Sequence, residues 1–441
     1  MLDYFDVIRQ NFIETYTTGP FVYVWFILGK TWWLFLPLFL LQAVWWYWTD
    51  WTTTMFIISL DFRILVVTVP RDSLGSPKGA EQMFASFWGM SHGLNFVEYY
   101  WLGKKQEPFS VELIGIDGHV RFIFRMPKEF KDFFETHIYA QYPEAEIMEV
   151  EDYTQIIPDD FLEKGYDMYG AEIMLSKEDA YPLRTYSEFE ERLTQEFIDP
   201  MAALTESLSR LGKGEQVWLQ WTCRPVPAGD PPYANPWKKE GEKIIKEKVE
   251  KLPAAQKNAI EKVLAVPINA IGGMIDQALE YEVDLFGGEQ KAIEPMKMLS
   301  PTDYNIVQAI YRSISKLGFE VKGRIAYIAK KDNFLVPRGF TGPMGALQQF
   351  NDQVLNGFKL DNKTKTKIDY FMKVRRTKWR KKKLLEMMKT RTMWAGPKPF
   401  ILNTEELATI FHFPTQIVKA ERIDRTKARK AGPPTDLPIG R

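Results

Sequence analysis

Residues 109–127 read FSVELIGIDGHVRFIFRMP, and this stretch decides the fold class. Apolar, β-branched and aromatic residues fill two runs, FSVELIGID and HVRFIFRMP, and this composition is typical of strands. Asp117 and Gly118 stand at the junction, where such a pair favours the tight turn of a β-hairpin. The stretch therefore predicts two neighbouring antiparallel strands.

The segments on either side of the hairpin complete a β-α-β-β-α-β order. Before it, residues 54–70 predict a strand, and residues 76–90 predict a helix with Ser76 as its cap. After it, residues 129–143 predict a helix and residues 145–152 predict a strand. This is the order of a split βαβ, or ferredoxin-like, unit.

A second set of elements echoes this order further along the chain. Its predicted elements are strand 170–177, helix 189–211, strand 215–226, helix 301–318, strand 319–331 and helix 345–355. Residues 229–300 interrupt the set as a proline-rich and then charged insertion. Two interpretations of the insertion stay open: a solvated hairpin or linker, and a segment that docks on a membrane surface or a partner.

An uncharged aromatic stretch lies near the N-terminus. Residues 31–49, TWWLFLPLFLLQAVWWYWT, would form a helix of about 28 Å, close to the thickness of bilayer hydrocarbon. Tryptophans gather near both ends, as membrane interfaces favour. We expect a single-pass helix in the plasma membrane, with the bulk of the chain in the cytoplasm. The expected interface residues are Trp32, Trp33, Trp45, Trp46, Trp48 and Trp51.

The predicted fold class is α+β. One N-terminal transmembrane helix precedes two tandem ferredoxin-like (split βαβ) units and a basic helical C-terminal arm. A chain of 441 residues accommodates several domains. The expected boundaries are 1–51 for the anchor, 52–165 and 166–360 for the two α/β domains, and 361–441 for the arm, a short capped helix and a proline-rich tail.

Motifs that carry chemistry are missing from the sequence. The single Cys223 excludes an internal disulfide and a cysteine-based metal site, and the four histidines are widely spaced. Gly29-Lys30-Thr31 resembles the end of a phosphate-binding loop, but Val24 occupies the position that requires the first glycine. We therefore expect a protein that is not an enzyme, with no catalytic residues, metal or cofactor.

Two stretches carry opposite charge. Residues 129–163 hold eleven acidic residues and one lysine, whereas residues 363–391 hold thirteen basic residues and two acidic ones. The basic stretch suits DNA phosphates or anionic lipid headgroups, although a solvated helix that packs on one side explains it too. The candidate residues for binding nucleic acid or another anion are Lys373, Arg375, Arg376, Lys378, Trp379, Arg380, Lys381, Lys382 and Lys383.

Four runs together resemble an uncharacterised membrane-protein family of archaea and small-genome bacteria. They are AEQMF (80–84), IYAQYPEAEIMEVEDY (138–153), YPLRTYSEFEERLTQEFIDPMAAL (181–204) and LNTEELATIFHFP (402–414). Members of that family are similar to the N-terminal region of HerA/TraG-like ATPases, and we expect this chain to lack the motor domain.

The resemblance implies a membrane-anchored adaptor of a type IV secretion-like or conjugation-like DNA translocation system, which docks a separate HerA/TraG-like ATPase. The family supplies no catalytic residues. The alternative is a membrane-surface scaffold that binds anionic lipid or protein partners and is unrelated to DNA. The oligomeric state stays open.

Overall fold

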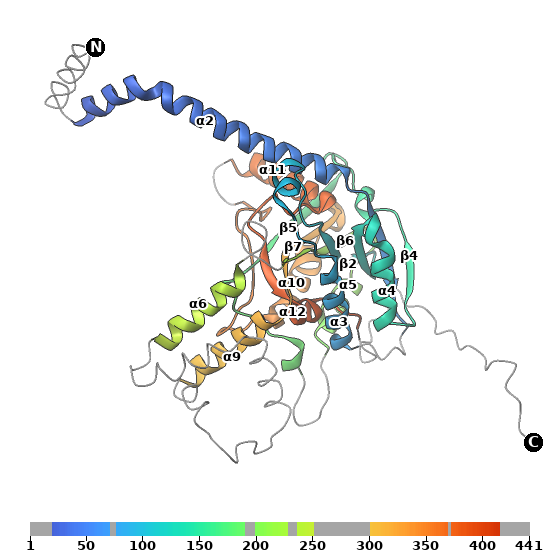
Figure 1. Cartoon of the computed structure of the whole chain (residues 1–441). Coiled ribbons are helices and arrows are strands. Elements are labelled where there is room, and N and C mark those ends of the chain that lie inside the picture. Colours follow the sequence, from blue (N-terminus) through green and yellow to red (C-terminus); the bar gives the residue numbers. More distant parts are fainter. Residues whose placement is uncertain are drawn as a thin grey trace, which may run out of the picture. The chain divides into compact units, whose positions relative to one another are not determined.

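The computed structural model describes residues 20–70, 76–189, 199–227, 236–250, 300–368 and 372–414 (Figure 1). The chain divides into two compact units. Unit 1 comprises Met1–Leu60 and Leu94–Lys105, and unit 2 comprises Asp61–Gly93 and Gln106–Arg441. Most of the predicted insertion (251–299) and the whole proline-rich tail (415–441) lie outside the described residues.

Unit 1 consists of the helix α2 (Pro20–Ser59) and the short π-helical turn η2 (Val97–Trp101). Aromatic rings join the two segments. The ring centroid of Trp45 lies 5.8 Å from that of Tyr100, and the centroid of Trp48 lies 5.8 Å from that of Trp101. All six expected interface tryptophans lie on α2 and are between 37% and 75% exposed: Trp32, Trp33, Trp45, Trp46, Trp48 and Trp51.

The prediction of a membrane-spanning helix is wrong. None of the helices in the described ranges combines the length and the apolar composition that crossing a bilayer demands. Pro37 and Gln42 interrupt the apolar side chains of α2, and its many Trp and Tyr rings add less hydropathy than aliphatic side chains do. The expected single-pass location in the plasma membrane is corrected on the same ground.

The strand predicted over residues 54–70 is only half right. Residues 54–59 continue α2, and the strand β1 (Phe62–Thr68) begins after the helix has ended. β-Branched and aromatic residues such as Ile57 and Phe56 occur in both element types, so composition did not locate this boundary.

Unit 2 is built on one antiparallel sheet with the strand order β4-β1-β3-β2-β6-β7-β5-β8, to which β9 adds by pairing with β7. Besides β1, its strands are β2 (Phe109–Ile116), β3 (His119–Pro127), β4 (Glu146–Glu149), β5 (Tyr166–Leu175), β6 (Glu215–Pro225), β7 (Gly318–Lys330), β8 (Phe358–Leu360) and β9 (Phe400–Asn403).

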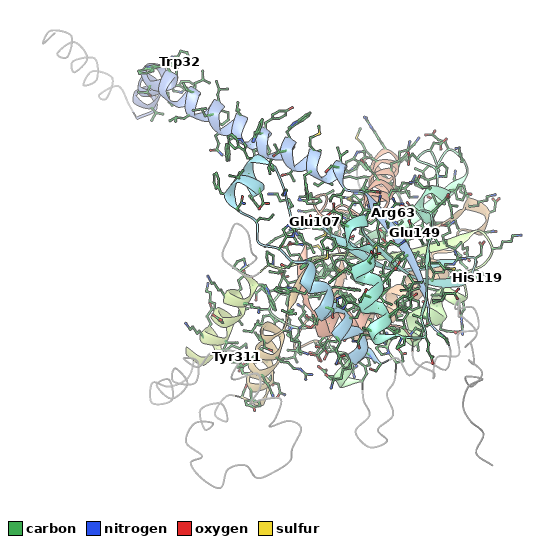
Figure 2. All side chains as sticks on the ribbon, turned by 45° about the vertical axis from the view of Figure 1, so that its right-hand side comes forward. Trp32, Arg63, Glu107, His119, Glu149 and Tyr311 are labelled. Carbon is green, nitrogen blue, oxygen red and sulfur yellow. The ribbon has the colours of Figure 1, made fainter. Side chains whose placement is uncertain are left out.

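The predicted hairpin is confirmed. β2 and β3 pair from Ser110↔Arg125 to Ile116↔His119. Asp117 and Gly118 turn the chain with φ values of 55° and 82°, in the left-handed region that this kind of turn requires. At the β1–β4 edge, Arg63 pairs with Glu149 at 3.2 Å across the two strands (Figure 2).

The predicted fold of a membrane helix and two tandem ferredoxin-like units is wrong, because both halves of unit 2 share one sheet. β2 pairs with β6 along its whole length, from Phe109↔Cys223 to Ile116↔Gln216. The half β4-β1-β3-β2 therefore continues directly into the half β6-β7-β5-β8. This pairing satisfies two strand edges that separate sheets would leave exposed.

The two faces of the sheet are covered by different elements. The larger core packs α3, α4, α5, α10 and α12 against alternate strand residues such as Leu65 and Val67. The smaller core packs α11 and the 3₁₀ turn η4 against the strand residues that point to the other face of the sheet, such as Ile64 and Val66. The bounds are α3 (Pro77–Phe87), α4 (Lys131–Gln141), α5 (Met201–Ser209), α10 (Gly342–Leu347), α11 (Lys373–Thr390), α12 (Thr404–Ile410) and η4 (Tyr153–Ile156).

Two further helices form a third apolar cluster: α6 (Trp237–Glu250), which lies within the predicted insertion, and α9 (Pro301–Ser315), which follows it. Lys248 of α6 pairs with Asp303 of α9 at 2.6 Å. α9 begins at Pro301, where the predicted helix 301–318 begins, and Ser300 caps it, because the Ser300 hydroxyl accepts a hydrogen bond from Asp303 N.

Candidate nucleic-acid interface

The helix α11 carries all nine basic-arm candidates and is fixed to the sheet by its C-terminal half. Leu384, Leu385, Met387 and Met388 are buried in the smaller core, where Trp218 of β6 contributes the largest side chain. The first half of the helix is exposed: 83% of Val374 and 59% of Trp379 face solvent. The basic arm is therefore a helix that is packed at one end and open at the other.

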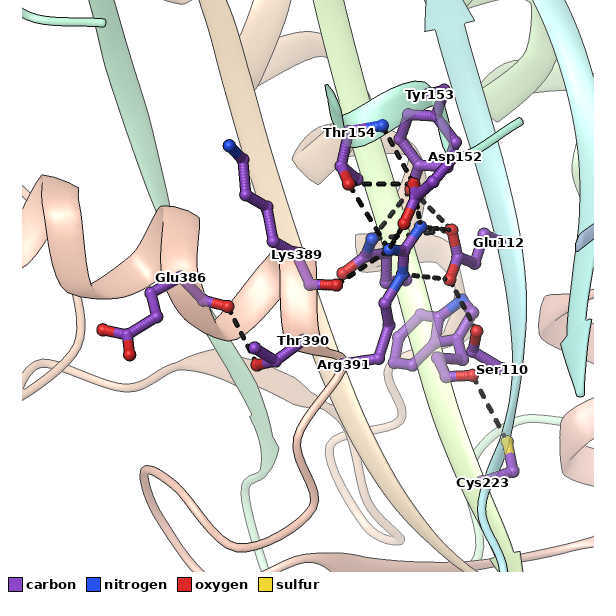
Figure 3. Close-up of polar contacts among 12 residues, drawn as sticks. Ser110, Glu112, Asp152, Tyr153, Thr154, Cys223, Glu386, Lys389, Thr390 and Arg391 are labelled. Carbon is purple, nitrogen blue, oxygen red and sulfur yellow. Dashed lines mark hydrogen bonds and ion pairs between the residues drawn. The ribbon is translucent and has the colours of Figure 1, made fainter. Parts of the chain in front are cut away.

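The buried guanidinium of Arg391, directly after α11, ties the helix to the strands (Figure 3). Arg391 is 1% exposed and has a left-handed φ of 50°. Its Nε donates to Glu112 Oε1 at 3.0 Å, and its Nη2 donates to Asp152 Oδ1 at 2.9 Å and Glu112 Oε2 at 3.3 Å. One side chain thus bridges β2 and the residue that precedes η4.

The network around Arg391 is electrostatically matched. Glu112 is fully buried and also accepts hydrogen bonds from Ser110 and the hydroxyl of Tyr153. Burial alone would raise the pKa of Asp152, but the hydrogen bond and the charge of Arg391 hold that pKa below its usual value. Burial and the nearby Arg391 charge lower the pKa of Arg125 to about 10. Arg391, Glu112 and Asp152 hold charge in the interior because they are paired.

The residues that follow Arg391 cover a second buried ion pair. Arg324 of β7 donates to Glu172 Oε1 at 3.0 Å and to the carbonyl oxygen of Thr392 at 2.6 Å. Lys322, 4% exposed, donates to the carbonyl oxygen of Ala395, and burial lowers the pKa of this lysine to about 8. Residues 391–396 therefore form a strap, held by cations of the sheet, that fixes the end of α11.

Acidic residues from the predicted acidic stretch meet the side of α11. Lys378 and Lys382 pair with the same carboxylate, Glu163, at 3.1 and 3.4 Å. Lys389 pairs with Asp159 at 2.6 Å. The two oppositely charged stretches therefore neutralise each other in part, which the sequence pattern alone did not indicate.

Two further candidates also face the protein. Lys381 pairs with Asp167, and both side chains are less than one third exposed. Arg380 donates to the backbone carbonyl oxygens of Lys365 at 2.8 Å and Asn362 at 3.0 Å. These two cations serve to seat α11 on the sheet.

The opposite side of α11 presents what we call the outer row: Arg375, Arg376, Trp379 and Lys383, all exposed. Arg375, Trp379 and Lys383 are spaced four residues apart and so lie along one side of the helix. Lys383 Nζ lies 4.9 Å from the centroid of the Trp379 ring, a cation–π contact. The row combines fixed positive charge with an aromatic ring, and this arrangement can hold an extended polyanion.

Cysteine and histidine side chains in the described residues include two that are buried, Cys223 and His412. Within these ranges, no group of three or more His, Cys, Asp or Glu side chains is arranged to hold a metal ion. Cys223 is fully buried, and burial raises the pKa of its thiol far above the usual value. His412 is buried too, between the carbonyl oxygen of Ala408 and the carboxylate of Asp199.

Fold and site together define an α+β protein with one large antiparallel sheet and a basic helix seated on one face. The profile of the domain of unknown function DUF8128 matches residues 76–338, which is more than half of the chain, and the chain belongs to this family. The matched range holds β2 to β7, whereas α11 and the strap follow it. A comparison with curated proteins finds no match.

The secretion and conjugation terms implied by the resemblance are corrected. The matching family has no known function, and the described ranges contain no helix suited to span a membrane. The likeness to the N-terminal region of HerA/TraG-like ATPases, and an ATPase partner, stay predictions from the resemblance.

Proposed function

We propose that this chain is a non-enzymatic scaffold that binds nucleic acid through the outer row of α11. The observation that carries the proposal is the exposed Trp379 between Arg375 and Lys383, on a helix whose other side is fixed to the sheet. Because Arg391 is buried and hydrogen-bonded, and Arg324 and Lys322 hold the strap, the row stands on a rigid support and loses little entropy on binding.

The dimensions of the row favour a nucleic-acid strand. Residues 373–383 extend over about 15 Å of helix, which is long enough to meet several successive phosphates. An exposed indole adds stacking worth about 1–3 kcal/mol per base, available only where bases are unpaired. We therefore expect single-stranded nucleic acid to bind more tightly than duplex.

Two other readings of the row make different predictions. An anionic lipid surface offers charge but no base to stack on Trp379. Under this reading, the Trp379 ring should contribute the same binding free energy at any anionic surface. A solvated helix would bind neither. Ionisable groups such as Glu112 and Arg391 are buried in mutual pairs, which favours a scaffold over an enzyme.

The experiment that tests the proposal measures fluorescence anisotropy of a labelled single-stranded oligonucleotide with the purified full chain. The variant Arg375→Gln/Arg376→Gln/Lys383→Gln should lower affinity about 10- to 100-fold at about 100 mM salt. Trp379→Ala should weaken single-strand binding more than duplex binding.

A matched control removes the same charge elsewhere. Lys78, Lys243 and Lys246 are exposed on α3 and α6, and these helices pack in other apolar clusters than α11 does. Their triple change to Gln should leave affinity within about twofold. Equal losses in both triple variants would show that net charge, and not the outer row, drives binding. Anionic vesicles that compete equally at matched charge would favour the lipid reading.

A further inference from the structure

The carboxylate of Glu163 holds two cations that border the outer row. Its Oε1 atom lies 3.1 Å from Lys378 Nζ and 3.4 Å from Lys382 Nζ. These lysines are one helical turn apart, so a single anion bridges them. At 3.6 residues per turn, Lys382 projects within about 60° of Trp379 around the helix axis.

The backbone places Glu163 against α11, while its side chain stays accessible. Residues 158–165 form a turn in which Glu163 N donates to Asp160 O at 2.8 Å and Tyr166 N donates to Phe161 O at 3.0 Å. Phe161 is fully buried in the smaller core and anchors the turn. The side chain of Glu163 is itself 56% exposed, and those of its two lysines are 52% and 44% exposed.

The lysines that pair with Glu163 are more exposed than the other lysines of α11 that form ion pairs. Lys381 and Lys389 are only 15% and 16% exposed, which fits a role in seating the helix. An ion pair as exposed as that of Glu163 contributes little net stability, so an incoming anion can replace it at low cost. The hydrogen bond from Lys378 lowers the pKa of Glu163, so the carboxylate is ionised at neutral pH.

We propose that Glu163 is an internal competitor of the bound phosphate: it occupies Lys378 and Lys382 until a nucleic-acid strand displaces it. This inference rests on the proposed function of the outer row and adds its regulation. Displacement would let both lysines join Arg375, Trp379 and Lys383 in one wider surface. Glu386, exposed one turn after Lys383, limits that surface at its C-terminal end.

The test compares Glu163→Gln with Asp160→Asn in the full chain. Gln has the shape of Glu but no charge, and Asp160 pairs with Lys164 instead of α11. Glu163→Gln should raise affinity for single-stranded DNA about twofold to tenfold at about 100 mM salt. It should also steepen the salt dependence by up to about 0.7 for each of the two lysines that gains a phosphate.

The outcomes separate this inference from the function on which it rests. Asp160→Asn should leave affinity and salt dependence unchanged. If the unaltered chain binds DNA but Glu163→Gln leaves both quantities unchanged, Glu163 is no competitor, although the proposed function stands. If neither protein binds at about 50 mM salt, the proposed function itself fails. Equal gains in Glu163→Gln and Asp160→Asn would reduce the effect to net charge and overturn the inference.

Discussion

Replacing Arg391 by Met should destabilise unit 2 more than any exposed charge on α11 does. The change removes the cation that bridges Glu112 and Asp152 and leaves Glu112 buried. Removing one partner of a buried pair typically costs 3–5 kcal/mol. Ser110 and Tyr153 still donate hydrogen bonds to Glu112, so we expect the lower end, about 3 kcal/mol.

The expected shift in melting temperature follows from the size of the cooperative unit. Unfolding entropy of about 2.1 cal/mol/K per residue over roughly 300 residues gives about 0.6 kcal/mol/K, so 3 kcal/mol corresponds to about 5 °C. Circular dichroism melts of the full chain would measure it. Arg391→Lys keeps the charge but loses the planar guanidinium group, so its melting temperature should lie between those of Arg391→Met and the unaltered chain. Lys330→Met, an exposed change in β7, serves as the control.

The pH dependence gives an independent readout of the same network. Arg391 holds the pKa of Asp152 below its usual value, so this carboxylate stabilises the fold above its unfolded-state pKa. That stability is lost as pH falls through the lowered pKa, and Arg391→Met should flatten this acid limb. The double variant Arg391→Met/Glu112→Gln should recover part of the loss. A shift under about 1 °C for Arg391→Met would refute the anchoring role.

Two further predictions concern the strap. Burial lowers the pKa of Lys322 to about 8. Between about pH 8 and the pKa of this lysine in the unfolded state, the folded state binds fewer protons, so the free energy of unfolding should rise with pH. Denaturant titrations should show that Lys322→Met loses this rise, and the same pH dependence in both proteins would contradict the prediction. Gly396 has a φ of 87°, and an added Cβ would lie 2.0 Å from Glu172 Oε2. Gly396→Ala should therefore lower the free energy of unfolding by about 1–3 kcal/mol. In the control Gly345→Ala the added methyl group meets nothing within 4 Å, so stability should not change measurably. Equal melting temperatures of the two variants would show that the strap accommodates the methyl group.

Local patterns in the sequence predicted local structure well. The run around Asp117 and Gly118 specified a hairpin and its turn, and Ser76 capped the helix where expected. Pairing between β2 and β6 was not predictable, because nothing in either strand alone indicates which edges join. The apolar composition of α2 predicted a helix correctly, whereas the prediction of a bilayer span was wrong.

The candidate site was found only in part. The basic run located α11, but counting charges could not separate Lys381, which is paired at the sheet, from Lys383 in the outer row. Arg391 was one more base in the same run, although it is the buried anchor. The sequences of the strands contain one relevant pattern: Glu112 and Gln220 alternate with apolar residues. Such alternation normally predicts that the polar side chains face solvent. Only the strand register shows that these two polar residues lie opposite each other in the sheet.

The most direct test of the nucleic-acid proposal is the salt dependence of single-stranded DNA binding by the full chain, between about 50 and 200 mM salt. If the three cations of the outer row each meet a phosphate, together they contribute about −2 to the slope of log Kobs against log salt. The triple Gln variant of Arg375, Arg376 and Lys383 should therefore flatten the slope by about 2. A slope shared by both proteins, or no binding by the unaltered chain at about 50 mM salt, would contradict the assignment of α11 as the interface.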